Sequence, residues 1–175
     1  TGIESAMFSD RKLAAAFAPP CKLAHLVYME SPTREHVEAV RKFVSAGGKV
    51  IVHYSTSPAF SKLMGTTAPE VVLADKDQWI GYTLPESRPL YAPKAIWYAG
   101  YKIWQVKPAA KTTSVLARWV DASGKPGPVA ILKTSHGFWI TRIMLETDDA
   151  DARRQLMASL SASCVPEIWR LAAKK

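Results

Sequence analysis

Two apolar runs of strand length lie in the first third of the chain, KLAHLVYM at residues 22–29 and KVIVHY at residues 49–54. Both are nearly continuously apolar, which is typical of strands that are covered on both faces. Between them, apolar residues recur at three- and four-residue spacing over residues 37–44, which predicts a helix ending at the Gly47–Gly48 pair. A shorter helix is predicted over SPAFSKLMG, residues 57–65. This order predicts a right-handed βαβ unit with parallel strands.

The second half of the chain has a different pattern. Residues 71–84 and 94–106 are rich in aromatic and β-branched residues without helical spacing, which favours strands or extended loops. Residues 113–145 predict three strands separated by turns at DASGKPG and TSHG. We therefore expect antiparallel hairpins to be added to a mostly parallel sheet in this half.

The last predicted helix begins in the acidic stretch at residues 146–151, where negative charge favours a helix N-terminus. Pro166 ends it, and EIWRLAAKK follows as a short helical tail. No repeat or internal boundary is visible. The sequence therefore predicts one α/β domain at residues 1–169 and a helical tail or linker at residues 170–175.

The composition limits the classes of partner. The chain has 175 residues and a formal net charge of +8, but its basic residues are scattered and form no run of five or six. A solvated basic surface is therefore favoured over nucleic-acid binding. No apolar run reaches the ~18 residues of a membrane span, and no signal peptide is visible. Because the chain does not begin with Met, we expect it to be a mature, excised or partial sequence.

Cysteine and histidine spacing gives no metal framework. Cys21 and Cys164 would form a disulfide only if the last helix ended beside the first strand, so their pairing stays open. The histidines, which are His25, His36, His53 and His136, form no pair at ligand spacing on a helix. Glycine-rich phosphate loops are also absent from the sequence, so no metal or cofactor is predicted.

The turn HYSTS at residues 53–57 raises the question of a reactive elbow. A nucleophile at such a turn needs small neighbours, normally glycine, and Ser55 has none. The turn is better explained as the cap of the following helix, and no catalytic residue is predicted. Loops at the carboxyl ends of parallel strands do, however, bind ligands in open α/β sheets. The candidate ligand-binding residues are therefore Glu30, Ser31, His53, Tyr54 and Ser55.

Three tryptophans form a second candidate. Trp79, Trp97 and Trp104 lie in the aromatic-rich middle of the chain and could present ring faces to a sugar or a partner. Ordinary burial is the competing explanation for all three. Trp119 and Trp139 lie in predicted strands and are expected in the core.

The segment REHVEAVRKFVSAGGKVIVHYSTSPAFSKLMG resembles the central unit of class I glutamine-amidotransferase-like domains. The later segment from VLARWVDASGK through GFWIT to PEIW is similar to a narrower group. This group is the amidotransferase-like accessory domain that precedes the catalytic barrel in family 10-like glycosylhydrolases. The resemblance implies a flavodoxin-like three-layer α/β/α sandwich. It also implies that a first strand ahead of Ser9 is absent or supplied from outside these residues.

Catalytic amidotransferases carry a cysteine at the elbow, which this sequence lacks. The resemblance therefore implies a non-catalytic accessory module of a larger carbohydrate-active protein, serving assembly or ligand binding. Its partners would be a C-terminal catalytic barrel, further copies of the chain and carbohydrate, and the parent protein would be exported or periplasmic. The alternatives are a stand-alone hydrolase that uses the turn of His53 and Ser55, and an anion- or nucleic-acid-binding domain.

Overall fold

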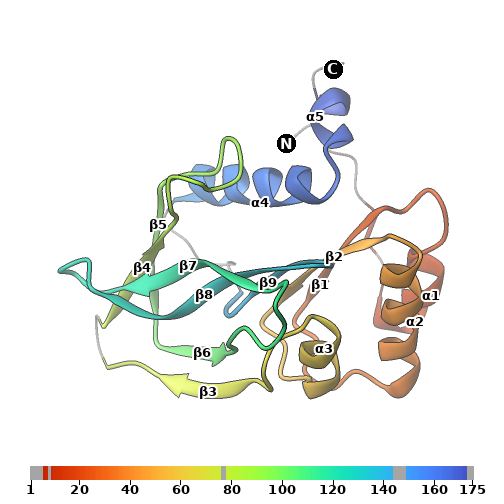
Figure 1. Ribbon diagram of the computed structural model, residues 1–175, viewed down its shortest axis with the longest axis horizontal. Helices are drawn as coiled ribbons and strands as arrows, with labels where there is room; N and C mark the ends of the chain where they lie inside the picture. The colour runs from red at the N-terminus through yellow and green to blue at the C-terminus, as the bar shows by residue number, and fades with distance from the viewer. Residues whose placement is uncertain (1–5, 8, 76–77, 144–148, 173–175) are drawn as a thin grey trace.

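The computed structural model describes residues 6–7, 9–75, 78–143 and 149–172 (Figure 1). The helices are η1 (Asp10–Lys12), α1 (Leu13–Ala16), α2 (Arg34–Ser45), α3 (Pro58–Leu63), α4 (Ala150–Cys164) and α5 (Glu167–Ala172). The strands are β1 (Leu23–Val27), β2 (Lys49–His53), β3 (Glu70–Leu73), β4 (Trp79–Thr83), β5 (Ala95–Gly100), β6 (Lys102–Gln105), β7 (Ser114–Val120), β8 (Pro126–Thr134) and β9 (Gly137–Ile140). Helix α5 crosses the expected boundary at residue 169, and the division into domain and tail stays a prediction.

Seven strands form one sheet in the order β1-β2-β9-β8-β7-β4-β5, and β3 pairs with β6 in a separate ribbon. Strand β2 is parallel to β1 and β9, whereas the other four pairings of the large sheet are antiparallel. The α/β class is confirmed, but the expected mostly parallel sheet is wrong. Short turns join β7 to β8 and β8 to β9, and a short turn can join only antiparallel neighbours.

Helices cover both faces of the parallel end of the sheet (Figure 1). On one face, Leu156 and Leu160 of α4 share a cluster with Ile51 of β2. On the other face, residues of α2 and α3 pack on Val50 and Val52 of the same strand. This double coverage explains why the sequence of β2 is apolar without alternation.

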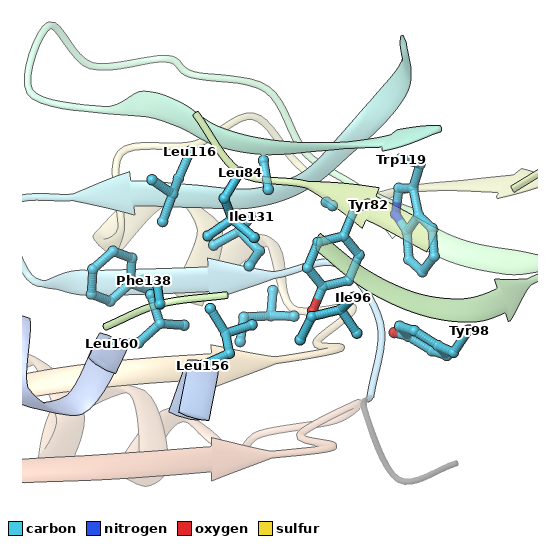
Figure 2. Packing of buried hydrophobic residues seen from close by; sticks show 14 of the residues in the cluster. Tyr82, Leu84, Ile96, Tyr98, Leu116, Trp119, Ile131, Phe138, Leu156 and Leu160 are labelled. Atoms are coloured by element: carbon cyan, nitrogen blue, oxygen red, sulfur yellow. The ribbon is translucent and has the colours of Figure 1, made fainter. Parts of the chain in front are cut away.

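Aromatic residues fill the core of the antiparallel end. The rings of Tyr82 and Trp119 meet edge to face at 5.4 Å between centroids, and Tyr98 lies 5.3 Å from the same indole (Figure 2). Strand β5, which carries Tyr98, contacts α4, the helix that also packs on β2, although β5 and β2 are far apart in the strand order. The sheet is therefore strongly curled, and β5 is brought back toward the parallel strands.

Capping residues set the limits of α2 and α3. Thr33 caps α2, because its hydroxyl accepts from His36 N while the His36 ring accepts from Thr33 N. Helix α2 therefore begins at Arg34. Ser57 caps α3 ahead of Pro58. Gly47, with φ of 94°, follows α2 in the left-handed conformation that the sequence predicted.

Strand β9 joins the parallel and antiparallel parts of the sheet. It is parallel to β2 on one side and antiparallel to β8 on the other. Gly137 begins it with φ of 134°, and a Cβ atom there would lie 2.1 Å from the carbonyl oxygen of Val50. Only glycine allows β9 to approach β2 this closely.

Candidate functional site

Three parallel strands end at the same edge of the sheet, and each is followed by a long side chain. Tyr28 follows β1, Tyr54 follows β2, and Arg142 lies two residues after β9. The backbone continues the ladder beyond the strands, since Tyr28 N donates to His53 O at 3.0 Å and Tyr54 N donates to Ile140 O at 2.9 Å. The chain therefore places two aromatic rings and a guanidinium where open α/β sheets bind ligands.

Tyr28 and Tyr54 both adopt a backbone conformation that glycine or asparagine would adopt more easily. Their φ angles are 57° and 49°, and the left-handed region costs an ordinary residue roughly 1–2 kcal/mol. The two rings stack with 5° between their planes and 5.6 Å between centroids. Tyr28 is 52% exposed, so this strain is not compensated by burial of its ring. Strained residues of this kind cluster at functional sites.

A buried threonine fixes the position of Arg142. Thr141 has no exposed surface, and its hydroxyl donates to Val129 O at 3.0 Å or Ala130 O at 3.2 Å. The Trp119 indole in turn donates to the Thr141 hydroxyl at 3.3 Å. The threonine therefore holds the backbone firmly one residue before the arginine.

The Arg142 guanidinium is oriented by aromatic rings and one hydrogen bond. It lies over Tyr101 at 4.8 Å and over Tyr98 at 5.7 Å from the ring centroids. Its Nη1 donates to Lys102 O at 3.2 Å. Cation–π contacts of this kind contribute about 0.5–2 kcal/mol. They leave the remaining N–H groups of the fork available for an anion.

These residues line an open cavity of about 270 Å³, which we call the tyrosine–arginine cavity. Its lining consists of Tyr28, Tyr54, Tyr98, Tyr101, Lys102, Arg142 and Ile143. Both ionised groups in the lining are cations, and no carboxylate of the described residues forms an ion pair with either. Among the described side chains, the Tyr98 hydroxyl is one of the buried polar atoms without a hydrogen-bond partner. Burial raises the pKa of Tyr98, against the opposing effect of Arg142, so its hydroxyl stays protonated.

Ser55 has a structural role at the turn after β2. The residue is fully buried, and its hydroxyl donates to Met29 O at 2.7 Å while accepting from Ser57 N at 3.2 Å. The strained position at this turn belongs to Tyr54. No imidazole in the described part of the chain bonds to the Ser55 hydroxyl, so the pair of nucleophile and base that a hydrolase needs is not formed.

His53 takes part in a different chain of hydrogen bonds. Its Nε2 lies 3.2 Å from His25 Nδ1, and His25 Nε2 lies 3.1 Å from the Ser161 hydroxyl on α4. Burial, with a smaller effect of His25, lowers the pKa of His53 to about 3. Desolvation also lowers the pKa of His25. At neutral pH both rings are uncharged, and they link β1 and β2 to α4.

Glu30 and Ser31 lie on the exposed loop between β1 and α2. The Glu30 carboxylate beside Tyr28 raises the pKa of the Tyr28 hydroxyl. Thr56 Oγ1 donates to Glu30 O at 2.6 Å, which ties this loop to the turn after β2. Neither Glu30 nor Ser31 lines the cavity. Of the five predicted ligand-binding residues, Tyr54 does.

Six lining residues were not among the predicted ligand-binding residues, namely Tyr28, Tyr98, Tyr101, Lys102, Arg142 and Ile143. Tyr28 carried a usable signal, because it follows β1 just as Tyr54 follows β2. Arg142 carried a weaker one, as a basic residue just beyond a predicted strand. Tyr98 and Tyr101 belong to the aromatic-rich middle of the chain, which was the second candidate, but no local pattern places them at this site, since the curl of the sheet brings them there.

The three tryptophans of the second candidate are not brought to a common surface. Trp79 is 4% exposed and packs beside Trp119, with ring centroids 6.2 Å apart. Trp97 is 49% exposed. Trp104 is partly buried beneath the Lys102 ammonium, which lies 5.4 Å from its ring centroid. A register shift in β4 between Trp79 and Gly81 accompanies this separation.

The described residues form no metal site and no disulfide. No group of three or more His, Cys, Asp or Glu side chains among them is placed to hold a metal ion. Cys21 and Cys164 are both free thiols, and burial raises the pKa of Cys164 to about 11. No helix in this part of the chain combines the length and the apolar character needed to span a membrane.

Comparison with known proteins relates the chain to others by structure. No family model and no curated protein matches its sequence. A β-galactosidase from Bacillus circulans sp. alkalophilus matches with a TM-score of 0.60 and 15% identity, over 81% of this chain and 22% of that one. A candidate ThuA-like protein from Bacteroides uniformis matches with a TM-score of 0.60 and 12% identity, over 89% of this chain and 74% of that one. A candidate GMP synthase protein from Thermoplasma acidophilum matches with a TM-score of 0.54 and 10% identity, over 95% of this chain and 82% of that one.

At these identities the similarity shows the fold alone. The chain spans about a fifth of the β-galactosidase and most of the length of the other two proteins. It therefore shares its α/β fold both with small proteins of this size and with one part of a much larger glycosidase.

Proposed function

We propose that this chain is a non-catalytic, amidotransferase-like accessory module of a larger carbohydrate-active protein and that it binds a ligand at the carboxyl edge of its parallel strands. The relation to a flavodoxin-like sandwich is part of this proposal, since helices cover both faces at the parallel end. The match to about a fifth of a β-galactosidase supports attachment to a larger enzyme. We also propose that a catalytic barrel follows the tail in the parent protein, that the chain associates with further copies of itself, and that the parent protein is exported.

The turn after β2 is the observation that carries the non-catalytic part. A hydrolase or glutaminase of this fold would need a reactive side chain at the strained residue that follows the strand. That residue is Tyr54, with φ of 49°. The adjacent Ser55 hydroxyl is buried and donates to a backbone carbonyl, so it is neither exposed nor activated.

The proposal that the chain binds a ligand rests on the side chains that line the cavity at the carboxyl edge of the parallel strands. The cavity is lined by stacked tyrosine rings, an oriented guanidinium and a lysine. Small-molecule binding sites commonly combine aromatic side chains with a few convergent polar groups in this way. No general base is needed for binding, and His53 is committed to His25.

Turnover measurements test this proposal. The purified chain should release no ammonia from glutamine and should not hydrolyse aryl esters or aryl glycosides above the rate without protein. Matched Ser55→Ala and Ser135→Ala proteins should give the same result. Turnover that Ser55→Ala abolishes and Ser135→Ala preserves would establish a serine hydrolase instead.

A further inference from the structure

We propose that the tyrosine–arginine cavity binds a single uronic-acid ring, with the ring carboxylate on Arg142 and Lys102 and an apolar sugar face on the tyrosines. This inference rests on the proposed function and names the ligand class of the same site. Its parts are the charge of the cavity, the exposed ring faces and the size of the space.

The charge of the lining selects an anion. Arg142 and Lys102 are the ionised groups of the lining, and neither forms an ion pair with a carboxylate of the described residues. The guanidinium is already oriented by Tyr101, Tyr98 and Lys102 O, so little side-chain freedom is lost when it binds. A planar guanidinium matches a carboxylate with two parallel hydrogen bonds.

The aromatic lining selects a ring. Tyr28 is 52% exposed and Tyr101 is 68% exposed, so both can offer ring surface to a ligand. The C–H groups on the apolar face of a pyranose carry partial positive charge and suit the negative face of an aromatic ring.

The size and charge of the cavity limit the ligand further. Its volume of about 270 Å³ lies just below the ≈ 300–1,000 Å³ of drug-sized sites, which suits one sugar ring. A phosphate ester would bring nearly two negative charges close to Glu30, the carboxylate beside Tyr28. The lining includes no helix N-terminus to support a phosphate. A carboxylate with a single charge fits better.

Binding measurements on the chain of residues 1–175 test the proposal, with ligand titrations followed by two-dimensional NMR. Glucuronate and galacturonate are compared with glucose and galactose, which have the same ring without the carboxylate. Uronates should bind about tenfold or more tightly than the neutral sugars, because a hydrogen bond to a charged group is worth roughly that factor. Digalacturonate shows whether the ring is taken as a free acid or as the end of an acidic polysaccharide. Equal binding of the two would favour the polysaccharide source.

Two variant pairs locate the site. Arg142→Gln should reduce the preference for glucuronate over glucose to about twofold or less. Arg118→Gln should leave it unchanged, although Arg118 also donates its Nη1 to a backbone oxygen, Gly127 O at 3.2 Å. Tyr28→Leu should weaken binding of both sugars. Tyr91→Leu should not, although Tyr91 is equally strained, with φ of 63°, and is 62% exposed.

The proposal fails if glucuronate binds no better than glucose, if neither uronate binds, or if the Arg118 variant loses as much affinity as the Arg142 variant. Tighter binding of glucose 6-phosphate or benzoate than of glucuronate would also overturn it. Folding of every variant is checked in the same NMR spectra, and Arg142→Lys is the second variant if Arg142→Gln does not fold. Hydrolytic turnover would refute the proposed function independently of these affinities. Absence of uronate binding without turnover would refute the uronate proposal alone and leave the non-catalytic module in place, so the failures of the two proposals are distinguishable.

Discussion

The parallel and antiparallel ends of the sheet place their tyrosines in different surroundings. At the parallel end, Tyr28 and Tyr54 stand at the strand edge in strained backbone, and Tyr28 is half exposed. At the antiparallel end, Tyr82 and Trp119 are 1% exposed and meet edge to face in the core. Composition alone does not separate these surroundings. The position of a ring relative to the end of its strand does.

The difference follows from what covers each end. Helices pack on both faces of β2, and the core at this end combines aliphatic side chains with Phe43, Phe60 and Trp139, whereas Tyr28 and Tyr54 lie at the strand edge. The antiparallel strands have less helix to cover them. They bury large area by curling, which brings rings from β4, β5 and β7 together. The same curl carries Tyr98 to the cavity, so the site depends on both ends.

The sharpest way to break this arrangement is at β9, where the two ends join. Gly137→Ala would place a Cβ atom 2.1 Å from Val50 O, and the backbone of β2 cannot yield without losing its ladder. We expect a loss of about 4 kcal/mol or more in the free energy of unfolding, measured by urea titration.

Gly124→Ala is the matched control for this change. Its φ is also positive, at 80°, but nothing lies within 4 Å of the added methyl group. We expect a loss of roughly 1–2 kcal/mol, from backbone strain alone. Equal losses at the two glycines would mean that strand approach at β9 does not limit stability.

A core ring of the antiparallel end gives the next largest effect. Trp119→Ala removes a fully buried indole and leaves the Thr141 hydroxyl without its donor. We expect a loss of about 3–5 kcal/mol. Trp97→Ala, on β5 and 49% exposed, should change the free energy of unfolding by less than about 1 kcal/mol. Similar losses for both would contradict the division between core and surface rings.

The parallel end was more predictable from sequence than the antiparallel end. Continuous apolar runs and the Gly47–Gly48 pair identified β1, α2 and β2, because local periodicity and local turn chemistry determine these elements. The three strands after residue 113 and their turns were also predicted correctly. The sequence did not predict that antiparallel pairs would make up most of the sheet, because strand order depends on contacts between distant segments.

The candidate site shows the same limit. Tyr54 was found because the carboxyl ends of parallel strands can be located from the sequence. Arg142 and Tyr101 were missed because they reach the cavity through pairings that no local pattern encodes. Trp79 was expected as a possible surface residue, yet it is buried against Trp119 beside the register shift in β4.

Acid should weaken the histidine link at the parallel end. In the native state the pKa of His53 is lowered to about 3 by burial, whereas the unfolded chain takes up a proton near pH 6.5. The unfolded state therefore binds more protons between these values, and stability falls as the pH is lowered through this window. The expected slope is about 1.4 kcal/mol per pH unit for this residue.

Urea titrations at pH 7, 6 and 5 measure this slope. His53→Gln should remove most of it, whereas His136→Gln, at the turn between β8 and β9, should leave most of it in place. A wild-type stability that does not change between pH 7 and pH 5 would show that protonated His53 is accommodated in the folded protein.

The smallest expected change in stability concerns the strained rings themselves. Tyr28→Asn relieves a left-handed conformation that asparagine tolerates, worth roughly 1 kcal/mol, and removes one exposed stacking contact of similar size. We expect the free energy of unfolding to change by less than about 1 kcal/mol in either direction, while sugar binding is lost. Tyr101→Asn, 68% exposed and without a positive φ, should also lose binding but gain nothing from strain relief. If Tyr28→Asn lowered the free energy of unfolding by several kcal/mol, Tyr28 would have a structural role. A ring whose role is to bind a ligand contributes little to the stability of the free protein.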